Sequence, residues 1–134
     1  MRVLALDYGS ARCGCAVSDP TGTLATPIEP VLRPATRKGM ARIGELVRER
    51  GAQLVVVGLP LSLSGADSDQ TAETRSFAAR LAQRLDIPVE LCDERFTTLM
   101  ARRDPGDPSA SEDSRAAAHL LEGWLAVRFN RQAG

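Results

Sequence analysis

The sequence predicts an α/β fold with one five-stranded mixed sheet flanked by helices. Residues 2–32 contain three short apolar stretches joined by short turns, a pattern typical of an antiparallel meander. Further along, apolar strands alternate with amphipathic helices, and such units build parallel strand pairs. The 134 residues contain no internal repeat and no long linker, so we expect a single domain over residues 1–134.

The expected elements follow in the order β-β-β-α-β-α-β-α-α. The expected strands are Arg2–Leu6, Cys13–Ser18, Leu24–Leu32 (interrupted by Pro27 and Pro30), Leu54–Val57 and Pro88–Cys92. The expected helices are Thr36–Arg50, Asp67–Leu85, Thr97–Arg102 and Glu112–Phe129. Thr36 and Gly51 are suited to cap the first helix, and Ser111 is a candidate cap for the last. The loop Gly58–Gly65 is equally compatible with a substrate contact and with a simple strand-to-helix connection.

The composition is that of a globular protein, with 43% hydrophobic and 25% charged residues. No apolar run is long enough to cross a membrane, and Asp7 interrupts the only N-terminal stretch that a signal peptide would need. We therefore expect a cytoplasmic protein with no membrane partner. The formal net charge of zero argues against nonspecific coating of nucleic acid, although it leaves a nuclease possible.

The three cysteines predict reduced thiols, because an odd count is typical of a cytosolic chain. Cys13 and Cys15 share one face of a strand and are close enough in sequence to ligate a soft metal. A zinc site needs more ligands, and His119 is the only histidine. We expect these cysteines to be small buried apolar residues.

Acidic residues stand at the ends of two predicted strands. Asp7 follows the first strand, and Asp93 and Glu94 end the last one. Ligands of sheets built from strand–helix units gather at the carboxyl ends of the strands, so two of these acids are expected to meet there. Asp93 and Glu94 point to opposite sides, and periodicity alone does not choose between them. Each acid also has an inert alternative as a turn or capping residue.

Asp113 is the third candidate acid. At about 100° per residue, it falls on the apolar stripe of the last helix and is expected to face the sheet. The alternative is an acid stabilised by the helix dipole. Three inward carboxylates without a histidine base suit hard divalent cations. Two such ions can clamp both oxygens of an in-line phosphoryl displacement, which points to metal-dependent phosphate chemistry.

Three motifs resemble those of the YqgF (RuvX) family, which is named for Holliday-junction resolution and implicated in maturing the 5′ end of pre-16S ribosomal RNA. The motifs are Asp7-Tyr-Gly-Ser-Ala-Arg-Cys-Gly-Cys-Ala16, Val57-Gly-Leu-Pro-Leu-Ser-Leu-Ser-Gly65 and Asp93-Glu-Arg-Phe-Thr-Thr98. They occur in the family's order and span almost the whole chain, which makes the resemblance specific.

The resemblance implies a ribonuclease H-like fold and a nuclease that hydrolyses phosphodiester bonds with two Mg²⁺ or Mn²⁺ ions. It implies that Asp7, Glu94 and Asp113 are the catalytic metal ligands. Four further residues are expected to bind substrate: Arg12 and Arg95 as phosphate contacts, and Tyr8 and Ser10 beside the first acid. Tyr8 is also the best placed of the few aromatic residues to stack on a base.

The sequence departs from the family pattern before Asp113. The stretch Asp104–Glu112 is acidic and contains no lysine or arginine, where the family usually has a basic residue. This departure leaves open how the substrate strand is held on that side.

The expected partners are branched or single-stranded DNA or precursor ribosomal RNA, and a homodimer is required for symmetric cleavage of a junction. Two other function classes compete. A nucleic-acid-binding regulatory protein of the same fold would cleave little, and it would keep its binding after loss of Asp7. The first motif also resembles the phosphate loop of actin-like ATPases, but the chain has room for only one of their two domains and lacks an obvious second loop.

Overall fold

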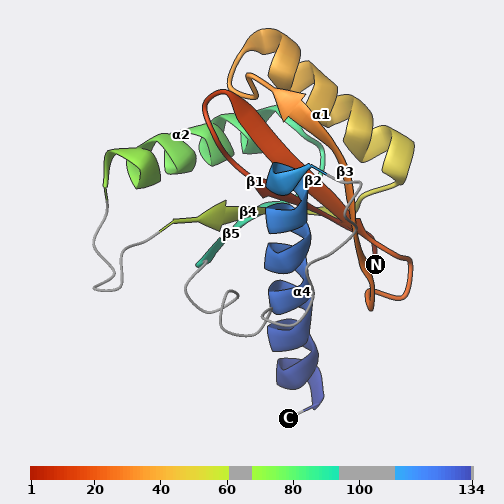
Figure 1. Cartoon of the computed structure of the whole chain (residues 1–134). Helices are drawn as coiled ribbons and strands as arrows, with labels where there is room; N and C mark the ends of the chain where they lie inside the picture. The colour runs from red at the N-terminus through yellow and green to blue at the C-terminus, as the bar shows by residue number, and fades with distance from the viewer. Residues whose placement is uncertain (61–67, 94–110, 134) are drawn as a thin grey trace.

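The computed structural model describes residues 1–60, 68–93 and 111–133, and it arranges them as one sheet with helices on both faces (Figure 1). The strands are β1 (Val3–Asp7), β2 (Arg12–Ser18), β3 (Ala25–Leu32), β4 (Leu54–Leu59) and β5 (Val89–Asp93). The helices are α1 (Arg37–Arg50), α2 (Asp69–Arg84) and α4 (Glu112–Ala133). The predicted short helix Thr97–Arg102 and most of the Gly58–Gly65 loop lie outside the described residues.

The strands form one five-stranded sheet in the order β3-β2-β1-β4-β5. β1 pairs antiparallel with β2, and β2 pairs antiparallel with β3. β4 runs parallel to both β1 and β5. The predicted mixed sheet with an antiparallel first half is therefore confirmed. This topology brings the carboxyl ends of β1, β3, β4 and β5 to a single edge of the sheet.

β3 is continuous where the sequence predicts an interruption. Both prolines are accommodated because β3 is an edge strand, where a missing backbone N–H costs little. The register with β2 shifts between the pairs Cys13↔Val31 and Cys15↔Ile28. Three residues of β3 therefore span two of β2, and this bulge falls next to Pro30.

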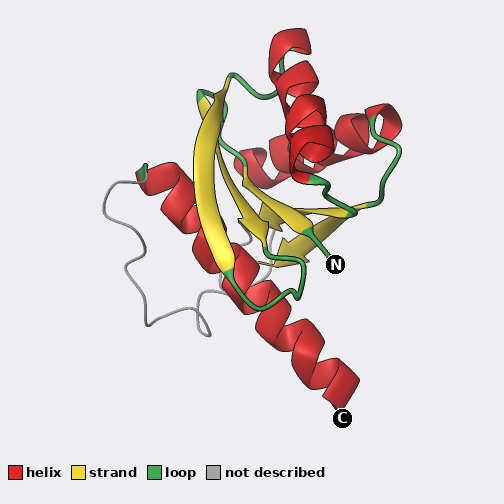
Figure 2. Ribbon diagram, turned by 90° about the vertical axis from the view of Figure 1, so that its right-hand side faces the viewer, coloured by secondary structure: helices red, strands yellow, loops and turns green. Residues whose placement is uncertain are grey.

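The sheet separates two hydrophobic layers (Figure 2). α1 and α2 cover one face, whose buried cluster includes Leu4, Leu6 and Phe77. α4 covers the other face, where Val3, Ala5 and Leu121 belong to the second cluster. Successive β1 side chains alternate between these layers, as strand geometry requires. The position of a residue along β1 therefore decides which layer it faces.

α1 has the ends that the sequence predicts. The Thr36 side chain accepts a hydrogen bond of 3.1 Å from the N–H of Gly39. Gly51 ends the helix in the left-handed region with φ 65°, a conformation that glycine adopts without steric cost. α2 begins two residues later than expected, because Ser68 and Thr71 form a capping box there.

α4 is the longest described helix, with 22 residues. Its buried residues all lie in the half that covers β1 and β2, and they include Ala117, Leu120 and Leu121. Among the described residues, no helix combines the length and apolarity that a membrane span requires.

Candidate carboxylate site at the edge of the sheet

Asp7 is the last residue of β1 and lies at the sheet edge where four strands end. Val3 and Ala5 belong to the layer under α4, whereas Leu4 and Leu6 belong to the opposite layer. The alternation therefore assigns Asp7 to the α4 side of the sheet. Its side chain is half-buried, so the carboxylate stands at the boundary between the core and solvent.

Gly14 brings α4 close to Asp7. It pairs with Asp7 across the β1–β2 ladder. On its α4 side it touches the backbone of Asp113 so closely that a Cβ at Gly14 would lie 1.8 Å from the Asp113 carbonyl oxygen. Only a residue without a side chain permits this approach. Gly14 thus lies between two acids that are 106 positions apart in sequence (113 − 7).

Ser114 fixes the same contact by a hydrogen bond. The N–H of Cys15 donates to the Ser114 Oγ over 3.3 Å, and the Ser114 side chain is fully buried. Ser111 caps the helix start as predicted, because its Oγ accepts from the N–H of Ser114 over 3.1 Å. The beginning of α4 is therefore held against β2 by backbone and side-chain contacts together.

The orientation of α4 differs from the one expected from its apolar stripe. The buried line at its start runs through Ser114, Ala117 and Leu121, while Ala116 is exposed. Asp113 lies at the edge of this line, and 42% of its side chain is exposed. The prediction that Asp113 faces fully inward is wrong, because a buried serine takes the central position. The carboxylate instead faces the open sheet edge.

Arg12 lies beside Asp113, with its Nη1 4.0 Å from the Asp113 Oδ2. Both side chains are largely exposed, at 64% for Arg12 and 42% for Asp113. Exposed ion pairs of this length contribute little to folding stability. The guanidinium is therefore held near the acids while remaining accessible to an incoming phosphate group.

The electrostatics of the site are visible at Cys13. The pKa of its buried thiol is raised well above the usual value, first by a hydrogen bond with Cys15 and by burial. The negative charges of Asp7 and Asp113 raise this pKa further, which shows that both carboxylates act on the same region. Cys13 and Cys15 are fully buried free thiols, as predicted.

The structure contradicts the prediction that Tyr8 stacks on a nucleic-acid base. Only 6% of Tyr8 is exposed, and its ring stacks on Phe77 with centroids 4.4 Å apart. Its hydroxyl donates to the Glu73 Oε1 over 3.0 Å. The side chain belongs to the layer under α1 and α2, because it continues the alternation of Leu4 and Leu6. Tyr8 is a core residue with a polar end, and its ring faces are covered.

The remaining predicted residues fall in different places. Ser10 is exposed in the turn between β1 and β2. Glu94 and Arg95 lie outside the described residues. Asp93, the rejected alternative to Glu94, ends β5 one residue after Cys92, which packs against the α4-side cluster. By alternation Asp93 belongs to the opposite side from Asp7.

The donor set fits a hard cation better than a soft one. Within residues 1–60, 68–93 and 111–133, no group of three or more histidine, cysteine and acidic side chains is arranged to hold a metal. The structure does bring together two carboxylates, Asp7 and Asp113, at an accessible edge, whereas both nearby thiols are buried with protons retained. Carboxylate oxygens are the ligands that Mg²⁺ and Mn²⁺ prefer.

Gly14 and Ser114 shape the site, and sequence reasoning missed both. A glycine inside a strand marks a place where another backbone can approach closely. That signal was present, since Gly14 lies between two buried cysteines. Ser114 gave no comparable signal, because a serine in the first turn of a helix usually reads as a polar surface residue.

The sequence matches the family model described as "RuvX: Holliday junction resolvase" over residues 1–127. A protein of Koribacter versatilis named "Putative pre-16S rRNA nuclease" is 45% identical over 102 residues, covering 76% of this chain and 67% of the relative. A protein of the same name from Mycolicibacterium paratuberculosis is 40% identical over 143 aligned positions, covering 99% of this chain and 86% of the relative.

Among solved structures, the fold is similar to RuvC of Thermus thermophilus, with a TM-score of 0.60, 17% identity and 97% of each chain covered. The same protein in complex with a Holliday junction substrate gives a TM-score of 0.59 with 17% identity and 96% of each chain covered. These structures support the ribonuclease H-like fold expected from the sequence.

Proposed function

The chain belongs to the RuvX family of Holliday junction resolvases, and from this premise we propose that it is a divalent-metal-dependent nuclease. The proposed reaction is hydrolysis of phosphodiester bonds in structured nucleic acid. The observation that carries the proposal is the meeting of Asp7 and Asp113 on one side of the sheet, made possible by Gly14.

Asp7, Glu94 and Asp113 are the proposed metal ligands. Glu94 is chosen over Asp93 because Cys92 faces the same layer as Asp7, and strand alternation assigns the next equivalent position to residue 94. When bound by these carboxylates, a pair of Mg²⁺ or Mn²⁺ ions supplies activation of the attacking water and stabilisation of the leaving oxygen.

The protein's own residues supply positioning. Arg12 is accessible beside Asp113, where its planar guanidinium can bind a phosphate oxygen and orient the strand. Ser10 is exposed in the same turn and can donate a hydrogen bond to the backbone of the substrate. Arg95 is proposed as a second phosphate contact from its motif alone. The buried, proton-bearing Cys13 thiol excludes water beneath the acids without adding a competing negative charge.

The proposed substrates are four-way junction DNA, single-stranded DNA and precursor 16S ribosomal RNA. The first follows from the family description and the last from the names of the relatives. Symmetric cutting of a junction needs two active sites, so a homodimer is part of the proposal for that substrate. Sedimentation of the protein with and without junction DNA measures the oligomeric state.

The test is a cleavage assay in Mn²⁺ that offers these three substrates to the native protein, to Asp7→Asn and to Asp113→Asn. Asp86→Asn is the matched control, because Asp86 is an exposed acid in the turn before β5, at the opposite edge of the sheet. We expect both site variants to lose cleavage and the control to keep it. The preferred substrate then identifies the biological role.

A second readout separates metal binding from turnover. Mn²⁺ is expected to raise the melting temperature of the native protein and of Asp86→Asn, but not that of Asp7→Asn. Equal cleavage by native protein and Asp7→Asn would refute the catalytic assignment. Binding without any cleavage would favour the regulatory alternative of the same fold.

A further inference from the structure

A groove with a volume of about 540 Å³ lies where β3 ends and α1 begins. Its lining is mainly apolar at the floor, but four of its residues are basic: Arg33, Arg37, Lys38 and Arg42. No acidic residue stands in the first turn of α1 to offset them. In a chain with zero net charge, this is a local concentration of positive charge.

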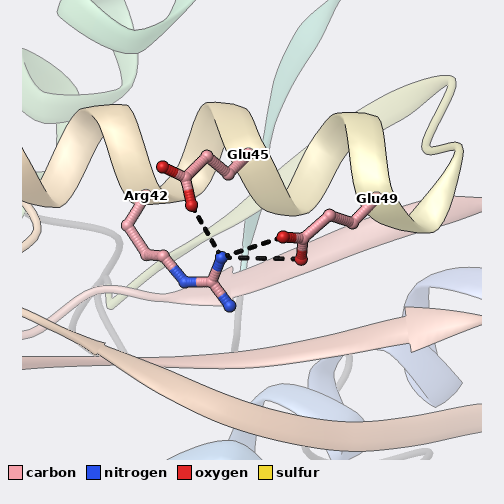
Figure 3. A network of polar contacts seen from close by, with 3 residues as sticks. All are labelled: Arg42, Glu45 and Glu49. Carbon is pink, nitrogen blue, oxygen red and sulfur yellow. Dashed lines mark hydrogen bonds and ion pairs between the residues drawn. The ribbon is translucent and has the colours of Figure 1, made fainter.

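Three of the four basic side chains retain an uncompensated charge. Arg42 is engaged, because its Nη1 lies 2.9 Å from Glu45 and 3.3 Å from Glu49 (Figure 3). The ion pairs found in the described part of the chain do not include Arg33, Arg37 or Lys38, and all three residues are exposed. The groove is therefore suited to a ligand that carries several negative charges.

The wall that carries Arg33 is rigidly built. Arg33 has φ 46°, in the left-handed region that glycine or asparagine adopts more easily. Its carbonyl oxygen accepts hydrogen bonds from the N–H and the Oγ1 of Thr36, over 3.1 Å and 2.7 Å. The same carbonyl lies against Gly39, where a Cβ would approach it to 2.1 Å. An arginine is thus retained at a backbone position that disfavours it.

The groove is connected to the carboxylate site along the sheet edge. The N–H of Arg33 donates to the carbonyl oxygen of Ala11 over 2.9 Å, and Leu32 pairs with Arg12. Only β2 separates β3 from β1, so the two strand ends are roughly 10 Å apart. The groove opens on the α1 side of the sheet and the acids on the α4 side, and the exposed turn that ends at Arg12 lies between them.

We propose that this groove binds the phosphodiester backbone of the nucleic-acid substrate at nucleotides beyond the scissile phosphate. The inference rests on the proposed nuclease function and assigns its substrate a second contact region. Arg37, Lys38 and Arg33 neutralise phosphates, and Leu32, which is 66% exposed, offers an apolar surface to a sugar. The strand crosses the turn at Arg12 to reach the acids.

The test compares Arg37→Gln/Lys38→Gln with the control Arg50→Gln/Arg84→Gln. Both variants lose two positive charges, but Arg50 and Arg84 are exposed residues in the last turns of α1 and α2, far from the groove. Binding of fluorescein-labelled single-stranded DNA of about 4 and about 16 nucleotides is measured by anisotropy in EDTA, at several salt concentrations.

For the longer strand, we expect the groove variant to lower the slope of log affinity against log salt by about 2, one for each lost phosphate contact. The shorter strand is expected to bind all proteins alike, because it does not reach both regions. In Mn²⁺, the groove variant is expected to raise KM for a long substrate more than it lowers kcat. The control is expected to match the native protein throughout.

A third variant keeps the test independent of folding. Arg33→Gly relieves the left-handed strain and is expected to raise the melting temperature while weakening binding of the longer strand. If the native protein cleaves but the groove variant binds with native affinity and salt slope, the groove proposal is overturned and the nuclease proposal stands. An equal loss in the control also overturns it. If the native protein neither binds nor cleaves, the nuclease proposal itself fails.

Discussion

The Asp113 carbonyl oxygen lies against the α-carbon of Gly14, so that a Cβ there would meet it at 1.8 Å. This contact joins the last described helix to the second strand. Through the pairing of Gly14 with Asp7, it also sets the separation of the two acids. Residue 14 therefore controls the geometry of the candidate site without contributing a functional group.

Gly14→Ala is expected to lower the free energy of unfolding by about 3 kcal/mol or more, because overpacking against backbone atoms leaves little room for relaxation. It is also expected to abolish cleavage, since α4 must move away from β2. Urea unfolding and the Mn²⁺ assay measure the two effects.

Gly44→Ala is the matched control for that substitution. Gly44 lies inside α1, and a Cβ there would meet its nearest atom, the Arg48 Nη1, at an ordinary 3.6 Å. Alanine in a helix interior is better than glycine by about 0.5–1 kcal/mol, so we expect a small gain in stability and native cleavage. A Gly14→Ala protein as stable as Gly44→Ala would contradict the close contact.

Arg12→Gln is expected to separate function from stability. The 4.0 Å pair with Asp113 is exposed on both sides, so its loss should change the free energy of unfolding by less than about 1 kcal/mol. Nucleic-acid affinity should fall, and its salt slope should decrease by about 1. A large loss of stability with unchanged affinity would instead make Arg12 a structural residue. Arg84→Gln is the control for the change in net charge.

Tyr8 predicts a specific alkaline instability. Burial, followed by the hydrogen bond to Glu73, raises the pKa of Tyr8 to about 12. The unfolded chain loses this proton near pH 10, so the stabilisation is complete below pH 10 and is lost as pH rises through 12. A shift of two pKa units corresponds to about 2–3 kcal/mol.

The Tyr8→Phe variant tests this pH dependence. Urea unfolding at pH 8 and pH 11 should show a smaller decline for Tyr8→Phe than for the native protein. At pH 8 the variant should be less stable by about 1 kcal/mol, because the hydrogen bond to Glu73 is lost. Parallel declines in the two proteins would show that the Tyr8 proton does not contribute.

The three thiols are expected to react at different rates. Cys13 and Cys15 are fully buried, and the raised pKa of Cys13 keeps its thiol protonated, whereas Cys92 is half-buried on β5. A colorimetric disulfide reagent at pH 8 should modify one thiol of the folded protein, and the other two only in urea. Cys92→Ser should remove the fast phase. Fast modification of two or more thiols in the native protein would contradict the packing around β2.

Sequence patterns predicted most of the fold because its signals are local. Thr36 and Gly51 mark the ends of α1, and the apolar β-branched run of β4 identifies a strand buried on both faces. The prolines of β3 were misleading, since only the strand order shows that β3 is an edge.

The site was less predictable because it depends on contacts between distant segments. The helical period placed Asp113 on the correct half of α4 but not at its edge, because it cannot register the seat that Gly14 provides for the backbone. Tyr8 read as an exposed aromatic beside an acid, whereas strand alternation assigns it to the opposite layer. In both cases the decisive information was the choice of packing partner, which no local pattern carries.

The late position of α4 in the chain has a consequence for synthesis. A nascent chain that has released all five strands with α1 and α2 already contains Asp7 and the groove at Arg33, yet it still lacks Asp113 and the helix that covers one face of the sheet. On the proposed ligand set, such a chain is able to hold nucleic acid weakly but not to cut it. Catalytic competence would then arise at the end of translation, when α4 docks on Gly14 and closes the site.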